Sequence, residues 1–135
     1  MKINFLSAKR SDINVQLAML RPAFNRVKEA KEEYQFCCDA VRKKQAGFYS
    51  VRGVGVKVRF VGMVTRDNDY LVLALTGKGL VNASQKIIDA VKGQGYRSII
   101  FHTVRPGMTR ILKRFGFVEN KADSDSVLTL HLGGH

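Results

Sequence analysis

The stretch 71–103 constrains the fold of this chain more than any other, because its hydrophobic period changes twice. It begins as LVLAL, an apolar run typical of a buried strand, and continues through a short glycine loop, TGKG. After the loop, Ala83, Ile87 and Val91 recur at helical spacing, and YRSIIFHT then has the pattern of a strand again. Such a strand–helix–strand unit predicts a right-handed crossover, with its two strands parallel neighbours or near-neighbours.

The remaining strands are predicted from twofold alternation of apolar residues. Those before the glycine loop, together with turns at Gly53–Gly55 and 66–69, predict an antiparallel meander. The predicted strands are 2–7, 48–51, 56–64, 70–75, 96–104 and 126–132.

Three helices are predicted besides the one in the crossover. Ser11 and Asp12 are typical N-caps of the first, and Pro22 suits the first turn of the second. Residues 106–115 have the spacing of a short third helix. One apolar stripe is expected along the second helix, formed by Phe24, Val27, Tyr34, Cys38 and Val41. The resulting order predicts a single α+β (α/β/α) domain over residues 1–135, with a mixed central sheet of about six to seven strands flanked by helices.

Charge separates this chain from an average soluble domain. It has 23 Lys and Arg against 11 Asp and Glu, a net charge of +12, and no acidic residue within 40–66 or 90–118. Such an imbalance predicts attraction to a polyanion, whether a nucleic acid, an anionic surface or a phosphorylated ligand. The cations singled out for such a partner are Arg42, Lys43, Lys44, Arg110, Lys113 and Arg114.

Two features of the sequence bear on the cellular compartment of the protein. No segment has the apolar length of a signal peptide or a membrane span. Cys37 and Cys38 are adjacent, a spacing that suits neither a disulfide nor a metal site. A reducing, cytoplasmic environment and no bound metal are therefore expected.

Residues 101–117 combine an apolar ladder with basic residues. One helical face, expected to pack on the sheet, carries Met108, Ile111, Leu112 and Phe115. The basic face between them suits solvent, coenzyme phosphates or a nucleic acid, and Arg105 places a guanidinium at the entrance of the helix.

Two segments resemble the GNAT superfamily of acyl-CoA N-acyltransferases, and small phage-encoded members in particular. LVLALTGKGLVNASQKIIDAVKGQGYRSIIFHT is similar to the family's strand, pyrophosphate loop, helix and next strand. RPGMTRILKRFGF is similar to its last helix with the Gly-Phe ending. By element order the resemblance covers nearly the whole chain and implies a GNAT-like fold.

The resemblance implies acetyl-CoA as cosubstrate and an amine as acceptor. The strand backbone would face the pantetheine arm, while the loop and helix start would hold the pyrophosphate, as helix N-termini do. The residues so assigned are Leu73, Ala74, Leu75, Thr76, Gly77, Lys78, Gly79, Leu80, Val81 and Arg105.

This chain also departs from the family pattern. Thr76 replaces the usual Arg or Gln, Val81 the third glycine, Arg105 the usual Asn, and Leu112 the tyrosine that protonates the departing thiolate. Any acid must therefore come from another residue or from water, or be absent.

His102 and Tyr70 are the candidate catalytic residues. His102 lies near the end of its predicted strand, beside the expected cleft, and an imidazole titrates near neutral pH. Tyr70 begins the adjacent strand and is a second candidate acid or base. The structural alternatives are a strand histidine hydrogen-bonded to backbone or solvent, for His102, and a packed aromatic, for Tyr70.

Three functions remain open from the sequence. The first is acetyl transfer by direct attack of an amine on acetyl-CoA. The second is a catalytically inactive GNAT-like protein that binds nucleic acid or another protein. The third is a component of a phage virion or other assembly. A dimer is also possible, through the closing strand at 126–132.

Overall fold

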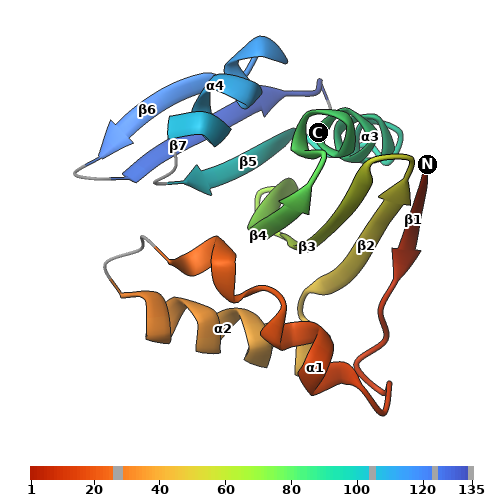
Figure 1. Ribbon diagram of the computed structural model, residues 1–135. Helices are drawn as coiled ribbons and strands as arrows, with labels where there is room; N and C mark the ends of the chain where they lie inside the picture. The colour runs from red at the N-terminus through yellow and green to blue at the C-terminus, as the bar shows by residue number, and fades with distance from the viewer. Residues whose placement is uncertain (26–28, 104–105, 123–124, 134–135) are drawn as a thin grey trace.

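The computed structural model describes residues 1–25, 29–103, 106–122 and 125–133. Among these residues seven strands form one sheet in the order β1-β2-β3-β4-β5-β7-β6 (Figure 1). The strands are β1 Lys2–Phe5, β2 Gly47–Gly53, β3 Val56–Val64, β4 Asp69–Lys78, β5 Ser98–Thr103, β6 Val118–Ala122 and β7 Asp125–His131. The helices are α1 Ile13–Ala18, the 3-10 helix η1 Arg21–Phe24, α2 Ala30–Arg42, α3 Leu80–Lys92 and α4 Pro106–Arg114.

The sheet is mixed, as the sequence predicts. Strands β1 to β4 pair antiparallel in chain order, which confirms the meander. Strands β4 and β5 pair parallel across the α3 crossover, and β7 then pairs antiparallel with both β5 and β6.

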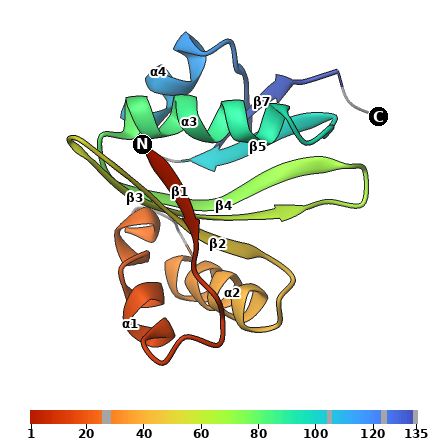
Figure 2. The same ribbon diagram turned by 90° about the vertical axis from the view of Figure 1, so that its right-hand side faces the viewer.

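Helices cover both faces of the sheet, giving three layers. Figure 2 shows α3 and α4 on one face, and α1 and α2 on the other. The larger core cluster lies under α3 and α4 and contains Ile87, Leu112 and Phe101, each at most 3% exposed. The smaller cluster lies under α1 and α2 and contains Leu17 and Phe48.

The helical region before β2 differs from the prediction in its boundaries. Pro22 lies in the 3-10 helix η1, and the long helix begins only at Ala30. The expected stripe is otherwise correct, because Phe24, Cys38 and Val41 are buried together; Val27 lies outside the described residues. Asp12 precedes α1 without a side-chain cap, since its carboxylate binds other side chains instead.

The end of the chain also differs from the prediction. Strand β6 was not predicted, because VENKA is mostly polar and shows no alternation. It occupies an edge of the sheet and makes β7 an interior strand. The expected pairing of the closing strand across a dimer is therefore wrong, since both of its edges already pair within the chain.

Candidate functional site

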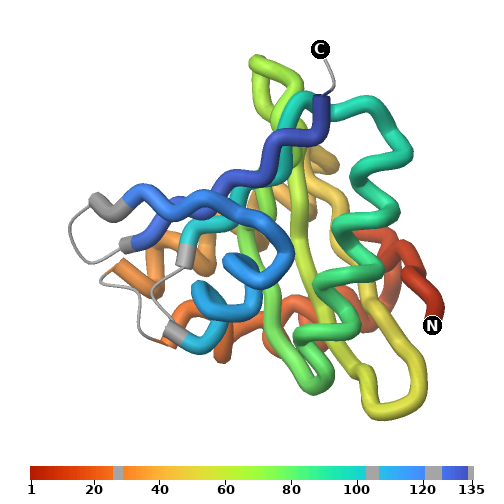
Figure 3. The backbone as a smooth tube through the Cα atoms, turned by 90° about the horizontal axis from the view of Figure 1, so that it is seen from above, coloured from red at the N-terminus to blue at the C-terminus, as the bar shows by residue number. Residues whose placement is uncertain are grey.

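The candidate site is centred on the separation of β4 from β5. Their register runs from Asp69 opposite Ser98 to Val72 opposite Phe101 and then stops, although β4 continues to Lys78. Figure 3 shows the two strands side by side at one end of the sheet and diverging toward the other. The second half of β4 therefore lacks a β5 partner, and we call this separation of the two strands the opening.

A β-bulge marks the point of separation. Ala74 is opposite Val61, and Val72 is opposite Gly62, so Leu73 is the extra residue of β4. Within the described registers Leu73 has no partner on β3 or β5. A bulge re-aims backbone groups and is over-represented next to active sites. Here the bulge lies at the point where the sequence resemblance places the pantetheine arm.

The TGKG segment is part of β4 rather than a free loop. Pairing with β3 continues to Lys78 opposite Lys57, and only Gly79 separates β4 from α3. A Cβ added at Gly77 would lie 2.1 Å from the Lys57 carbonyl oxygen, and one at Gly79 would lie 2.6 Å from the Gly55 carbonyl oxygen. Both glycines also have positive φ, +137° and +76°. Close packing on β3 and the β2–β3 hairpin thus requires both glycines, whether or not a phosphate binds.

The start of α3 nevertheless has the features of an anion site. The first backbone N–H groups of a helix lack intrahelical acceptors and carry partial positive charge. At Gly79, the residue before α3, no side chain caps these groups. A cavity of about 520 Å³ lies between Leu80, the first residue of α3, and the face of α4 that carries Arg110 and Arg114.

Arg110 and Arg114 lie four residues apart on α4, so they share one helical face. Both are exposed, and neither forms an ion pair with a carboxylate in the part of the chain that the structure describes. Two unpaired guanidinium groups beside a helix N-terminus suit a ligand that carries more than one phosphate.

His102 lies where the strands diverge. It follows Phe101, which is buried under α3 and α4, so strand alternation places the imidazole on the other face of the sheet. The side chain is exposed, and its strand partner on β7 is Val127. The structure thus brings His102 and the bulge at Leu73 to the start of the opening. Arg105 lies outside the described residues.

Tyr70 lies at the paired end of β4, opposite Ile99. Burial raises the pKa of its hydroxyl well above the usual range, with the neighbouring Tyr49 and Tyr96 adding to the effect. It lines a second cavity of about 510 Å³, with Tyr49, Tyr96 and Lys44 among the other lining residues. The structure therefore does not bring Tyr70 together with the glycine segment.

Leu112 is fully buried in the core cluster beneath α4. At this position, which the resemblance equates with the family's tyrosine, the chain therefore has a packing residue.

The two groups of basic residues singled out from the sequence lie apart. Arg42, Lys43 and Lys44 are at the end of α2, while Arg110, Lys113 and Arg114 are on α4, across the sheet (Figure 2). The two groups therefore do not form one continuous basic surface. Lys113 is also held by an ion pair of 2.7 Å with Glu119.

Two features are absent from the described residues. Within them no helix is long and apolar enough to cross a membrane. In the same residues no three His, Cys, Asp or Glu side chains gather where a metal ion would bind.

Comparison with known proteins gives matches at the level of structure. No family model and no curated sequence matches the chain. A Bacillus subtilis acetyltransferase in complex with CoA superposes with a TM-score of 0.65 at 15% identity, covering 97% of this chain and 98% of that one. An N-acetyltransferase from Staphylococcus aureus Mu50 gives 0.64 at 12% identity, covering 97% of each chain. A dodecameric spermidine N-acetyltransferase from Vibrio cholerae gives 0.65 at 10% identity, covering 97% and 93%. These likenesses confirm the predicted fold, while the resemblance to phage-encoded members stays a prediction.

Sequence reasoning missed two parts of this region. The bulge at Leu73 has no local signal, since LVLAL reads as an uninterrupted strand. Coenzyme phosphates were one of the partners expected for the basic face that carries Arg110 and Arg114, but the position of these residues beside Leu80 depends on how α4 packs. Their spacing of four residues was the available signal.

Proposed function

Since the chain has the GNAT fold, we propose that it binds acetyl-CoA where β4 and β5 separate and transfers the acetyl group to an amine. The observation that carries this proposal is the coincidence of the bulge at Leu73, the strand separation and the uncapped start of α3 along one path. A CoA complex is known for one of the structural neighbours, which supports this kind of cosubstrate.

In this proposal the phosphates lie at the start of α3. Backbone N–H groups of Leu80 and Val81 donate to the pyrophosphate, and Arg110 and Arg114 reach it from α4. Gly77 and Lys78 belong to the strand that leads there. The Val81 side chain is 43% exposed and lies where the family has a third glycine. It therefore leaves less room for the pyrophosphate at the start of α3.

The thioester end lies at the bulge. Acetyl-CoA supplies an activated carbonyl, which an amine attacks directly with loss of the thiolate. The β4 backbone around Leu73 and Ala74 orients the carbonyl and polarises it by hydrogen bonding. His102, on the opposite face of the sheet from α3, takes the proton that the amine releases. The Leu112 side chain has no acidic group, so solvent water protonates the leaving thiolate.

The acceptor class is constrained by charge. A net charge of +12 repels polycations, so neutral amines or amines bearing phosphate are favoured over polyamines. Tyr70 is the competing candidate for proton transfer, at the paired end of β4.

Calorimetric titration with acetyl-CoA tests the site. The wild-type protein is expected to bind one equivalent saturably. Arg110→Gln/Arg114→Gln is expected to weaken binding at least about tenfold, because each charge-assisted hydrogen bond is worth about 1.5–3 kcal/mol. The matched control Lys31→Gln/Lys43→Gln removes the same charge from exposed sites at α2 and should bind normally. Absence of binding at millimolar acetyl-CoA would overturn the proposal.

Thiol release with a panel of amines then tests the chemistry. The panel includes neutral and phosphate-bearing amines, with spermidine as the cationic comparison. His102→Gln is expected to lower kcat by about 10²–10⁴ while acetyl-CoA binding is unchanged. If Tyr70→Phe abolishes turnover and His102→Gln does not, the proton acceptor has been assigned to the wrong residue.

A further inference from the structure

A row of four basic residues crosses four neighbouring strands of the sheet. Lys2 of β1 is opposite Arg52 of β2, Arg52 is opposite Lys57 of β3, and Lys57 is opposite Lys78 of β4. All four are exposed. We call these residues the basic row; they were not grouped by the sequence analysis, since they are far apart in the chain.

The basic row faces the side of the sheet that carries α1. The residues next to it in the strands, Ile3, Val51 and Val58, belong to the core under α3, and alternate strand residues point to opposite faces. Figures 2 and 3 place the start of β1, the β2–β3 hairpin and the start of α3 at one end of the molecule. The four exposed side chains of the basic row therefore lie at that end of the molecule.

The basic row has no compensating acids. Within the described residues none of its four members forms an ion pair. Like charges directly opposite each other in a sheet are destabilising, and here three successive cross-strand pairs are cation against cation. A neutral or alternating row would fold more stably, so a bound anion is the natural counterpart of this arrangement.

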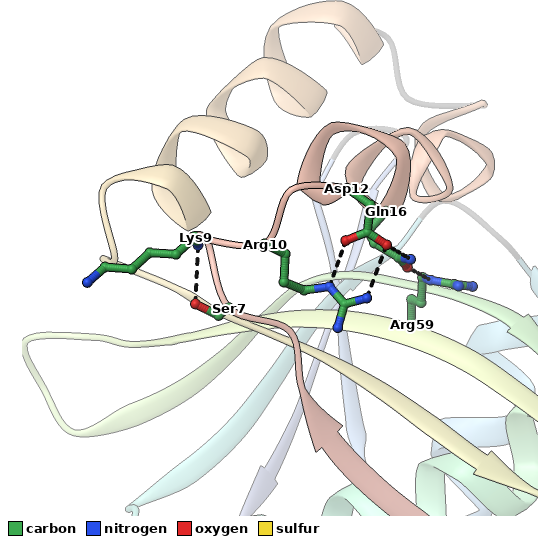
Figure 4. Close-up of polar contacts among 6 residues, drawn as sticks. All are labelled: Ser7, Lys9, Arg10, Asp12, Gln16 and Arg59. Atoms are coloured by element: carbon green, nitrogen blue, oxygen red, sulfur yellow. Dashed lines mark hydrogen bonds and ion pairs between the residues drawn. The ribbon is translucent and has the colours of Figure 1, made fainter.

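Arg59 is a fifth cation, on β3 two residues after Lys57 of the basic row. It is only 9% exposed, and its pKa is lowered by burial and by the charge of Arg52. Its Nε donates to Gln16 at 3.0 Å (Figure 4). Gln16 in turn donates to Asp12, but both oxygens of that carboxylate also accept hydrogen bonds from Arg10. The acid nearest to Arg59 in this network is thus already neutralised.

We propose that the basic row is a docking surface for the phosphate backbone of a nucleic-acid duplex. Neighbouring strands lie about 4.8 Å apart, so four side chains span about 14 Å in a line. A duplex strand advances about 3.4 Å per phosphate along its axis, so the basic row is as long as about five successive phosphates, and its four cations can contact up to four of them. A row of cations on neighbouring strands fits a linear polyanion better than scattered lipid headgroups.

The composition of the basic row favours backbone contact without base reading. Lys and Arg are the residues that neutralise phosphates, and no aromatic side chain lies in the row to stack on a base. Binding is therefore independent of sequence. The basic row shares one residue, Lys78, with the groups assigned to acetyl transfer. Its other three residues have no role there, so this inference does not depend on the proposed function.

Fluorescence anisotropy of a labelled 20-base-pair DNA duplex tests the proposal across a series of salt concentrations. Four phosphate contacts predict a slope of log K against log salt of about −3.6, and Arg52→Gln/Lys57→Gln should reduce its magnitude by about 1.8. At about 0.1 M salt this corresponds to at least a tenfold loss of affinity. Lys78 is left unchanged, so acetyl-CoA binding by this variant should equal that of the wild type.

The matched control is Lys86→Gln/Lys92→Gln, two exposed cations on α3 across the sheet. It removes the same charge and is expected to keep the wild-type slope.

Equal losses of affinity in both variants, or no binding of the duplex at 50 mM salt, would overturn the proposal. So would binding of anionic phosphatidylserine vesicles with the same dependence on Arg52 and Lys57, since the exposed Val54 at the hairpin tip would then mark a membrane contact. Thermal melts of both variants confirm that they are folded.

Discussion

Asp69 shows how one residue holds the paired end of the strand opening. Its carboxylate accepts hydrogen bonds from Arg97 Nε at 2.9 Å, Arg97 Nη2 at 2.6 Å and Ser98 Oγ at 2.5 Å. These bonds, those from Arg97 foremost, hold its pKa below the usual range. Asp69 begins β4 and Ser98 begins β5, so the cluster fastens the two strands at the start of their paired segment.

Asp69→Asn is expected to destabilise the protein by roughly 1.5–3 kcal/mol at pH 7, because a buried charge-assisted network is lost. The folded pKa is lower than the unfolded value of about 3.9. The contribution is therefore complete above that unfolded pKa and disappears as pH falls through the folded pKa. Urea unfolding at pH 7 and at pH 3 should show a smaller difference between variant and wild type at pH 3. Exposed Asp89→Asn is the control, and a difference that does not change with pH would contradict the assignment.

At the scale of elements, the meander β1–β4 tolerates an unfavourable charge pattern. Lys57 is opposite Arg52 on one side and Lys78 on the other. Lys57→Thr removes both repulsions and introduces a residue with better strand propensity, so stability should rise by about 0.2–1 kcal/mol. The measurement is chemical unfolding at low salt, and the gain should shrink at high salt. As the control, the same substitution at the exposed Lys86, on α3, should not stabilise the protein. A loss of stability in Lys57→Thr would contradict the prediction, because it would mean that the packing of the Lys57 aliphatic chain outweighs the charge repulsion.

At the scale of the whole molecule, one sheet separates two cores. Leu17 belongs to the cluster under α1 and α2, and Leu112 to the cluster under α3 and α4; both are at most 1% exposed. Leu17→Ala and Leu112→Ala should each cost about 2–5 kcal/mol. Because the two side chains share no cluster, the double variant should lose the sum to within about 0.5 kcal/mol. Fluorescence and circular dichroism should report a single transition, since the sheet is common to both cores. Losses far from additive would show that the two faces are coupled through the sheet.

The sequence by itself determined most of the elements. Its periodicity predicted β2 to β5, α3 and α4 within a few residues, and the crossover rule predicted that β4 and β5 are parallel. It did so because these elements bury a regular apolar face, which leaves a periodic trace in the chain. Strand β6 was missed for the converse reason: it pairs at an edge through its backbone, which any side chain permits.

Only the tertiary structure decided which residues of different elements are neighbours. The bulge at Leu73, the place of Arg110 and Arg114 beside Leu80, and the alignment of Lys2 with Arg52, Lys57 and Lys78 all depend on register and packing. Register is set by the joint burial of several strands, and a shift of one residue would move every side chain to the other face. Local sequence carries the period of a strand but not its partner, so the candidate site and the basic row became visible only in the assembled sheet.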